Sequence, residues 1–419
     1  MTRILNYSLI SLLIMTLGVS LYSCQKNTKP EKESELDKIN MAWKVTWERF
    51  YHPKTNQFYD YLISYEKGKE LSHLPTAEEV SRLYPNDCGY GTGMEDCMIS
   101  AGVMLSMIVD KYDVTENDDL REYAHNVFKG IKLSATAHNI HGFLARGVCV
   151  EDGKSTYICS SRDQYTHAVH GLWRYYHSPL SSSETRIEIG EILAAIADRM
   201  ESFVIPTNDY SIMRADGTPD IRGISKMWNV KGHEAARLPM IYAAAWDATG
   251  EKKYYDLYRN YIESSVEQSF NIEDITPTYS FLQMQCSFEI LIALEENDEL
   301  KDKMKEIMKL TSDRAVNRAI NAHKNAPELD LTMLTTDWRN GKGLDSKEDY
   351  RKVWYCVRES GEAALTQLMS TNYKAFNENQ KSLLLRAIMR LDYKKVSTSG
   401  IFYLQGAYWK ARKHQIIQE

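Results

Sequence analysis

The stretch Ser160-Ser161-Arg162-Asp163-Gln164-Tyr165-Thr166-His167 is the clearest helix start in the chain. It places an acid, a phenol and an imidazole in the first turn of a predicted helix that continues to Tyr176. The run Phe143-Leu144-Ala145-Arg146-Gly147 precedes it, with the turn Asp152-Gly153 between them. Polar groups are more concentrated here than anywhere else in the sequence, so the pattern of helix starts around it is the key to the fold.

Apolar periodicity predicts about twelve helices of roughly 15–20 residues between Leu36 and Lys413. Long links such as residues 53–92 and 137–162 precede the even-numbered helices, and mostly short links precede the odd ones. Short links produce antiparallel helix pairs, which gathers the long loops at one end. Even-numbered helices are small or apolar nearly all round, as at Ala243-Ala244-Ala245. The sequence therefore predicts an all-α fold, an (α/α)6 toroid of helical hairpins whose even helices form an inner ring.

The N-terminal residues predict that the protein is exported. Arg3 and the apolar run Leu9 to Val19 are typical of a signal peptide. Leu21-Tyr22-Ser23-Cys24 resembles a lipobox, so residues 1–23 are expected to be removed and Cys24 to be acylated. Residues 24–35 are Lys/Glu-rich and predict a flexible tether, and residues 36–419 form the predicted barrel domain. We expect a protein held by its lipid alone at a bacterial membrane, in the periplasm or at the cell surface.

The composition of the chain narrows the range of functions to be considered. A formal net charge of −6 argues against general nucleic-acid binding, which requires a basic surface. The 27 Tyr and 8 Trp suit stacking on sugars, although most will belong to the core. The cysteines other than Cys24 show no CxxC spacing and are expected to be reduced and buried. We expect no cofactor and no metal, because phosphate-loop and dinucleotide motifs are missing from the sequence and His167 with His170 lacks a convincing third ligand.

Inner helices of a toroid begin at the same mouth, so their first turns are considered together. Asp96 and Asp163 are the predicted catalytic pair. The predicted substrate contacts are Glu95, Arg146, Arg162, Tyr165, His167, His233, Glu234, Tyr279, Trp354, Tyr355 and Arg358. Capping of free N–H groups explains any single acid at a helix start, but it does not require several acids, arginines and phenols at one mouth. For Arg358, pairing with Glu359 or Glu362 on its own helix is an equal alternative.

Two carboxyl groups facing one bond are typical of glycoside hydrolysis. One of them must stay protonated near neutral pH, which requires burial or a neighbouring like charge. Arginines beside the acids would also bind the carboxylate of a uronate by paired hydrogen bonds. These residues predict hydrolysis of a uronate-containing oligosaccharide.

The helix pattern and these acids resemble the six-hairpin glycosidase superfamily, and within it the unsaturated glucuronyl and rhamnogalacturonyl hydrolases. The resemblance covers roughly residues 36–419 and implies a single (α/α)6 barrel. It implies that Asp163 is the general acid, which then activates water, with Asp96 assisting. The Trp-rich signature with Arg-Gly that those hydrolases carry is not evident here. Together with the lipobox, the toroid resembles the glycan-utilisation lipoproteins of Bacteroidetes.

Two alternatives stay open. The first is a polysaccharide lyase on the same toroid, with Tyr165, His167, Tyr279 or His233 taking a proton and Arg146 neutralising the carboxylate. The second is a non-catalytic glycan-binding lipoprotein that stacks sugars on Trp228, Trp338, Trp354 and Tyr355.

Overall fold

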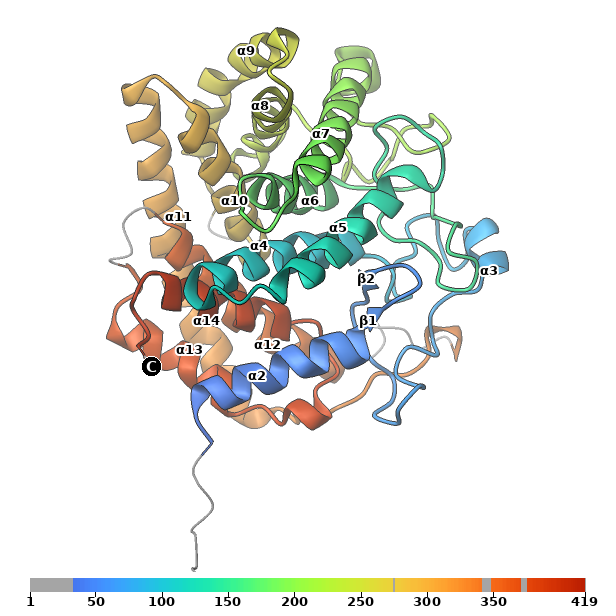
Figure 1. Ribbon diagram of the computed structural model, residues 1–419, viewed down its shortest axis with the longest axis vertical. Helices are drawn as coiled ribbons and strands as arrows, with labels where there is room; N and C mark the ends of the chain where they lie inside the picture. The colour runs from blue at the N-terminus through green and yellow to red at the C-terminus, as the bar shows by residue number, and fades with distance from the viewer. Residues whose placement is uncertain (1–32, 274–275, 341–347, 371–374, 419) are drawn as a thin grey trace, which may run out of the picture.

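The computed structural model describes residues 33–273, 276–340, 348–370 and 375–418. Within these residues, the helices form two concentric rings (Figure 1). The inner ring consists of α4 (Cys97–Thr115), α6 (Arg162–Tyr176), α8 (Arg237–Thr249), α10 (Thr278–Leu294), α12 (Glu348–Met369) and α14 (Ile401–Lys413). The outer ring consists of α2 (Glu35–Val45, extended by a π-helical turn over Thr46–Phe50), α5 (Leu120–Thr136), α7 (Ser183–Phe203), α9 (Lys252–Ser269), α11 (Asp298–Asn325) and α13 (Glu378–Met389). Each inner helix contacts the next, and α14 contacts α4, which closes the ring. The predicted all-α (α/α)6 toroid is confirmed.

Burial follows the two rings. In α14, every residue from Ile401 to Ala411 is buried, so only the last two residues of this helix reach solvent. In α11, buried residues recur every three or four positions, starting with Leu300, Met304 and Ile307, which leaves the opposite face in water. This contrast confirms that the even-numbered helices of the sequence pattern are the inner ones.

Glycines allow a close approach between α4 and α6 in the inner ring. A Cβ atom on Gly102 would lie 2.0 Å from the carbonyl oxygen of His167, and one on Gly171 would lie 2.8 Å from Cα of Gly102. A side chain at either position would force the two backbones apart.

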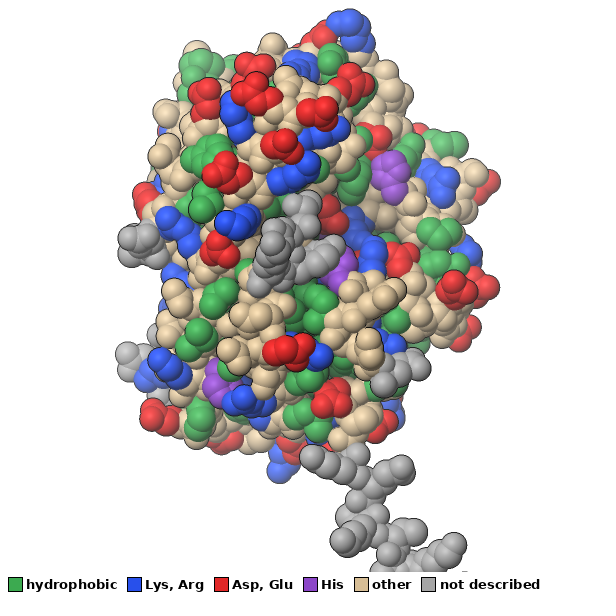
Figure 2. Space-filling view, turned by 90° about the vertical axis from the view of Figure 1, so that its left-hand side faces the viewer, with side chains coloured by type: hydrophobic (Ala, Val, Ile, Leu, Met, Phe, Trp, Pro, Cys, Tyr) green, Lys and Arg blue, Asp and Glu red, His purple; other side chains and the backbone are tan. Residues whose placement is uncertain are grey.

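Long loops gather at one side of the bundle, around α3 (Ala77–Ser81) and the antiparallel pair β1 (Tyr51–His52) and β2 (Gln57–Phe58) (Figure 1). On the opposite face, acidic and basic side chains are interspersed (Figure 2). In the described ranges, no helix is long and apolar enough to cross a membrane. The predicted signal peptide, Cys24 and most of the tether lie outside those ranges.

The sequence pattern predicts that two inner helices begin near Gly93 and at Gly232, and both begin later in the structure. Helix α4 starts at Cys97 rather than near Gly93, because Gly93 has a left-handed φ of 84° and the chain turns there. Glu95 and Asp96 therefore precede the helix, and the N-cap Asp96 makes no side-chain capping bond. Helix α8 starts at Arg237, after a separate 3-10 turn over Gly232–Glu234.

One cysteine prediction is wrong. Cys88 and Cys159 form a disulfide with a Cα–Cα distance of 4.8 Å, although they are 71 residues apart in sequence. The loops before α4 and α6 meet only in the folded chain, so the spacing gave no indication of the pair. Cys97, Cys149, Cys286 and Cys356 are free and buried, as predicted.

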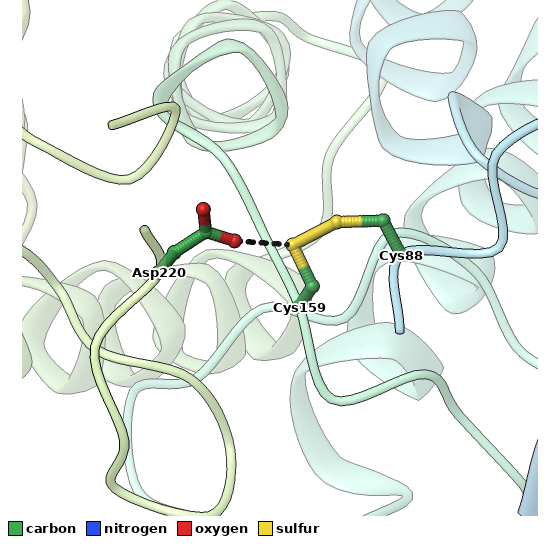
Figure 3. A group of neighbouring side chains, drawn as sticks. All are labelled: Cys88, Cys159 and Asp220. Carbon is green, nitrogen blue, oxygen red and sulfur yellow. Dashed lines mark hydrogen bonds between the residues drawn. A yellow bond between two sulfur atoms is a disulfide. The ribbon is translucent and has the colours of Figure 1, made fainter. Parts of the chain in front are cut away.

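The disulfide occupies the group of potential metal ligands found among the described residues, Cys88, Cys159 and Asp220 (Figure 3). Both sulfur atoms are used in the covalent bond. Arg222 donates to the Asp220 carboxylate over 2.6 Å and already neutralises its charge. This arrangement suits a covalent link between loops better than a cation site.

Candidate active site

A cavity of about 380 Å³ opens at the N-terminal ends of the inner helices. Its wall combines residues from the loops before α4 and α6 with the first turns of α6 and α10 and the N-terminal half of α12. The predicted residues that line it are Glu95, Asp96, Arg146, Asp163, Tyr279, Trp354, Tyr355 and Arg358. The lining residues that were not predicted are Asp60, Tyr90, Gly91, Ile99, Ser161, Ile224 and Arg351.

Asp96 is held by an amide and lies beside two guanidinium groups. Gln164 donates from Nε2 to Oδ1 of Asp96 over 3.0 Å. Nη1 of Arg146 lies 3.6 Å from Oδ1, and Nη1 of Arg358 lies 3.7 Å from Oδ2. Both arginine distances exceed a normal hydrogen bond, so each guanidinium keeps N–H groups for another anion.

Asp163 lies in the first turn of α6 and forms a tight ion pair. Nη1 of Arg237 donates to its Oδ1 over 2.5 Å, and Nη2 of the same arginine donates to Gln283. Burial among protein atoms raises the pKa of Asp163, but the charges of Arg237 and Arg162 outweigh it, and the net pKa is lowered. The side chain is still 29% exposed, because it faces the cavity. Asp163 is therefore ionised at neutral pH, which suits a base and not the proton donor that the resemblance implied.

Glu95 is anchored by backbone amides. The N–H groups of Gly91 and Gly93 donate to its two carboxyl oxygens over 2.9 and 2.6 Å. Burial, followed by the Asp96 charge, raises the pKa of Glu95 to about 7 against the opposing effect of these amides. Through these hydrogen bonds, Glu95 fixes the backbone at Gly91 and Gly93 in the loop that forms one wall of the cavity.

Asp60 was missed by the sequence analysis. It follows β2 in a long segment that the helical periodicity leaves unassigned, and it is only 3% exposed. Burial raises the pKa of the Asp60 carboxyl well above its usual range, and the charges of Asp96 and Glu95 add to this effect. The one local signal was an acid inside the aromatic run Phe58-Tyr59-Asp60-Tyr61, where a charged surface residue is out of place.

Arg358 pairs with an acid on its own helix and also lines the cavity. Its Nε donates to Glu362 on the same helix over 2.6 Å, and its guanidinium lies between the rings of Trp354 and Tyr403, 4.7 and 5.1 Å from their centroids. Nη1 still faces Asp96 in the cavity wall. The Trp354 indole N–H is buried and has no hydrogen-bond partner among the described residues. The rings of Trp354 and Tyr355 meet edge to face, 4.9 Å apart.

Arg146 is buried in the cavity wall and is 3% exposed. It donates from Nη1 to the Glu95 carbonyl over 3.0 Å and from Nη2 to the Tyr90 hydroxyl over 2.9 Å. Its guanidinium lies over the Tyr90 ring, 4.7 Å from the centroid.

Five predicted contacts do not line this cavity: Arg162, Tyr165, His167, His233 and Glu234. Arg162 and Glu234 pair with each other, and His233 lies 3.8 Å from Glu234. The Tyr165 hydroxyl is buried against the backbone of Gly142 and Leu144. His167 lines a separate cavity of about 20 Å³. Successive helix residues turn by roughly 100°, so one first turn presents only part of its polar residues to the mouth.

No family model and no curated protein matches the sequence. The fold is similar to a sugar epimerase from a ruminal bacterium, with 12% identity over 91% of this chain and 100% of that one, at a TM-score of 0.49. It is also similar to the cellobiose 2-epimerase of Spirochaeta thermophila, with 12% identity over 94% and 100% of the two chains and a TM-score of 0.45. An α-1,6-mannanase of Salegentibacter sp. matches at 13% identity over 67% and 87%, with a TM-score of 0.36. At these values the likeness concerns overall fold, and the function must be argued from the cavity.

Proposed function

We propose that the protein is a glycoside hydrolase that cleaves uronate-containing oligosaccharides, among them unsaturated ones. One observation carries this proposal: Asp96 and Asp163, at the starts of neighbouring inner helices, line one cavity together with Arg146 and Arg358. A pair of carboxyl groups around one bond is the arrangement that glycosidic cleavage requires. The lipobox at Cys24 supports a lipid-anchored location at the membrane, where polymer fragments arrive.

The charge of the cavity supports an acidic sugar. The raised pKa values of Asp60 and Glu95 favour the neutral form of these two carboxyl groups and so reduce the negative charge of the wall. Arg146 and Arg358 lie 3.6 and 3.7 Å from the Asp96 carboxylate, beyond normal hydrogen-bond distance, so both keep N–H groups for a second carboxylate. A uronate carboxylate would accept charge-assisted hydrogen bonds from these groups, whereas a neutral sugar offers no charged acceptor.

The aromatic wall supports binding of the sugar ring. Trp354 and Tyr355 offer apolar surface beside Arg358, and the buried indole N–H of Trp354 has no partner among the described residues. Burial of such an unpaired donor is costly unless a ligand satisfies it.

The lyase alternative is less well supported. Of the groups considered for it, Tyr279 and Arg146 line the cavity. Burial, followed by the Asp163 charge, raises the pKa of Tyr279, and a phenol acting as base needs a lowered pKa. The binding-protein alternative would gain support if Asp96 and Asp163 faced away from any cavity, but both line this one. Of its other aromatic residues, Trp228 packs on Tyr261 and Trp338 on Tyr84.

The test is release of reducing sugar from a panel of saturated and unsaturated uronate oligosaccharides. We expect Asp163→Asn to lower kcat at least about hundredfold, because the base is lost. Asp256→Asn removes an acid from an exposed pair with Lys252 on α9 and should keep wild-type activity. Full activity of Asp163→Asn would refute the assignment, and products that absorb like a C4–C5 double bond would favour the lyase.

A further inference from the structure

We propose that Asp60 is the proton donor to the leaving group in this cavity, a role that the family resemblance implied for Asp163. The inference rests on the proposed hydrolase function. A proton donor needs a carboxyl oxygen that is not already held by a protein hydrogen bond. The hydrogen bonds of the carboxyl groups in the cavity wall therefore indicate which of them can donate a proton.

Three of these carboxyl groups are engaged. Asp163 accepts from Arg237, Asp96 accepts from Gln164, and Glu95 accepts two backbone N–H groups. Hydrogen bonds of this kind favour the ionised form of a carboxyl group. The Asp60 carboxyl lines the same cavity, and in the described part of the chain no hydrogen bond or ion pair reaches it.

The backbone of Asp60 is fixed on both sides. Its N–H donates to the Gly93 carbonyl over 3.0 Å, and its carbonyl accepts from the N–H of Ser399 over 2.9 Å. The next residue, Tyr61, forms a β-bridge with Thr398. Asp60 is thereby held between the loop that carries Glu95 and Asp96 and the segment before α14. A catalytic group held rigidly in this way needs little reorganisation during the reaction.

The surroundings favour the protonated form of Asp60. Burial is the largest effect on its pKa, and the Asp96 and Glu95 charges add to it, whereas Arg358 and Arg146 act in the opposite direction with less weight. Other titratable groups that interact with Asp60 are Tyr61, Cys97, Tyr350 and Tyr403. The net pKa is raised, so Asp60 keeps its proton to a higher pH than an ordinary aspartate and loses it as the pH rises further.

In the proposed reaction, one proton moves to the leaving group and one proton is taken from water. The Asp60 carboxyl gives its proton to the glycosidic oxygen, and the bond between that oxygen and the anomeric carbon breaks with its electron pair staying on the oxygen. A water oxygen bonds to the anomeric carbon and loses a proton to the ionised Asp163. Both carboxyl groups then return to their starting states by proton exchange with solvent.

The experiment compares two leaving groups in Asp60→Asn and wild type. The substrates are methyl and dinitrophenyl uronides of both anomeric configurations, since a dinitrophenolate leaves without a proton and a methoxide does not. We expect kcat/KM for the methyl uronide to fall at least about hundredfold, while the dinitrophenyl uronide is cleaved at close to the wild-type rate. The alkaline limb of the wild-type pH profile should disappear in the variant.

The controls separate the two proposals. Asn is isosteric with a protonated Asp, so thermal unfolding should match wild type, and Asp60→Ser provides a second neutral variant. Equal loss on both leaving groups, or no loss on either, would overturn the role of Asp60 while leaving the hydrolase assignment intact. A wild-type protein that cleaves no uronide in the panel would overturn the hydrolase assignment itself, and the Asp60 role with it.

Discussion

At the scale of single residues, the cavity gives different states to chemically similar groups. Asp60 and Asp163 are both aspartates, yet burial beside other acids raises the pKa of the first, and arginine contacts lower that of the second. Such divergence is how one site obtains both an acid and a base at the same pH. The distinction comes from neighbours that lie far apart in sequence, such as Arg237, which is 74 residues from Asp163.

A prediction at this scale concerns Arg146. Arg146→Lys keeps the charge but loses the planar fork that contacts Glu95 and Tyr90 and would hold a uronate carboxylate. We expect KM for a uronate oligosaccharide to rise about tenfold, equal to about 1.4 kcal/mol, with a smaller change in kcat.

The matched control is Arg199→Lys. Arg199 is also a buried arginine, but it donates to the carbonyls of Ile212, Met213 and Arg214, outside the cavity. KM should not change in this variant, and its thermal unfolding reports the cost of altering a buried arginine. An equal rise of KM in both variants would argue against substrate recognition by Arg146.

At the scale of helices, the position of Asp163 depends on how closely α6 approaches α4. Gly102 and Gly171 allow this approach, and they lie deeper in the barrel than the residues of the mouth. The glycines therefore act on the site indirectly, by bringing the starts of two inner helices together.

The corresponding prediction compares two helix glycines. Gly102→Ala places a Cβ atom 2.0 Å from the His167 carbonyl, which belongs to a helix backbone and has little freedom to move. We expect a loss of at least about 2 kcal/mol in the free energy of unfolding, measured with denaturant. Gly190→Ala in α7 meets its nearest atom at 3.4 Å, so it should be neutral or stabilise by up to about 1 kcal/mol. If the two variants unfold alike, the close approach of α4 and α6 is not what requires the glycine.

At the scale of the whole molecule, the Cys88–Cys159 disulfide joins two loops that build the cavity wall. One loop carries Tyr90 and Gly91, and the other leads into Ser161 and Asp163. The covalent link closes a loop of the unfolded chain that spans 71 residues, and this lowers the entropy of unfolding.

We therefore expect a reducing agent to lower the free energy of unfolding of the wild-type protein by about 2–4 kcal/mol. The double variant Cys88→Ser, Cys159→Ser should start at the lower value and show no further change when the reductant is added. Denaturant titrations with and without reductant measure both quantities. An identical response of wild type and double variant to the reductant would mean that this disulfide does not stabilise the fold.

The rings of helices follow from local sequence, whereas the cavity does so only in part. Helix periodicity and the alternation of link lengths are properties of residues close together in sequence. They were sufficient to predict the toroid and the inner position of α14 and the other inner helices. The order of helix starts also brought Asp96 and Asp163 to one mouth. Tyr165 and His167, in the same turn as Asp163, were assigned to the mouth wrongly, because their directions depend on the rotation of α6 against its neighbours.

By itself, the sequence determined the helices, their pairing into rings and the end of the barrel at which polar groups meet, because each of these depends on spacing along the chain. The tertiary structure alone decided that Asp60 joins the cavity, that Asp163 is ionised by Arg237, and that Cys88 meets Cys159. The physical reason is that burial and charge act over a few ångströms between segments that are tens or hundreds of residues apart.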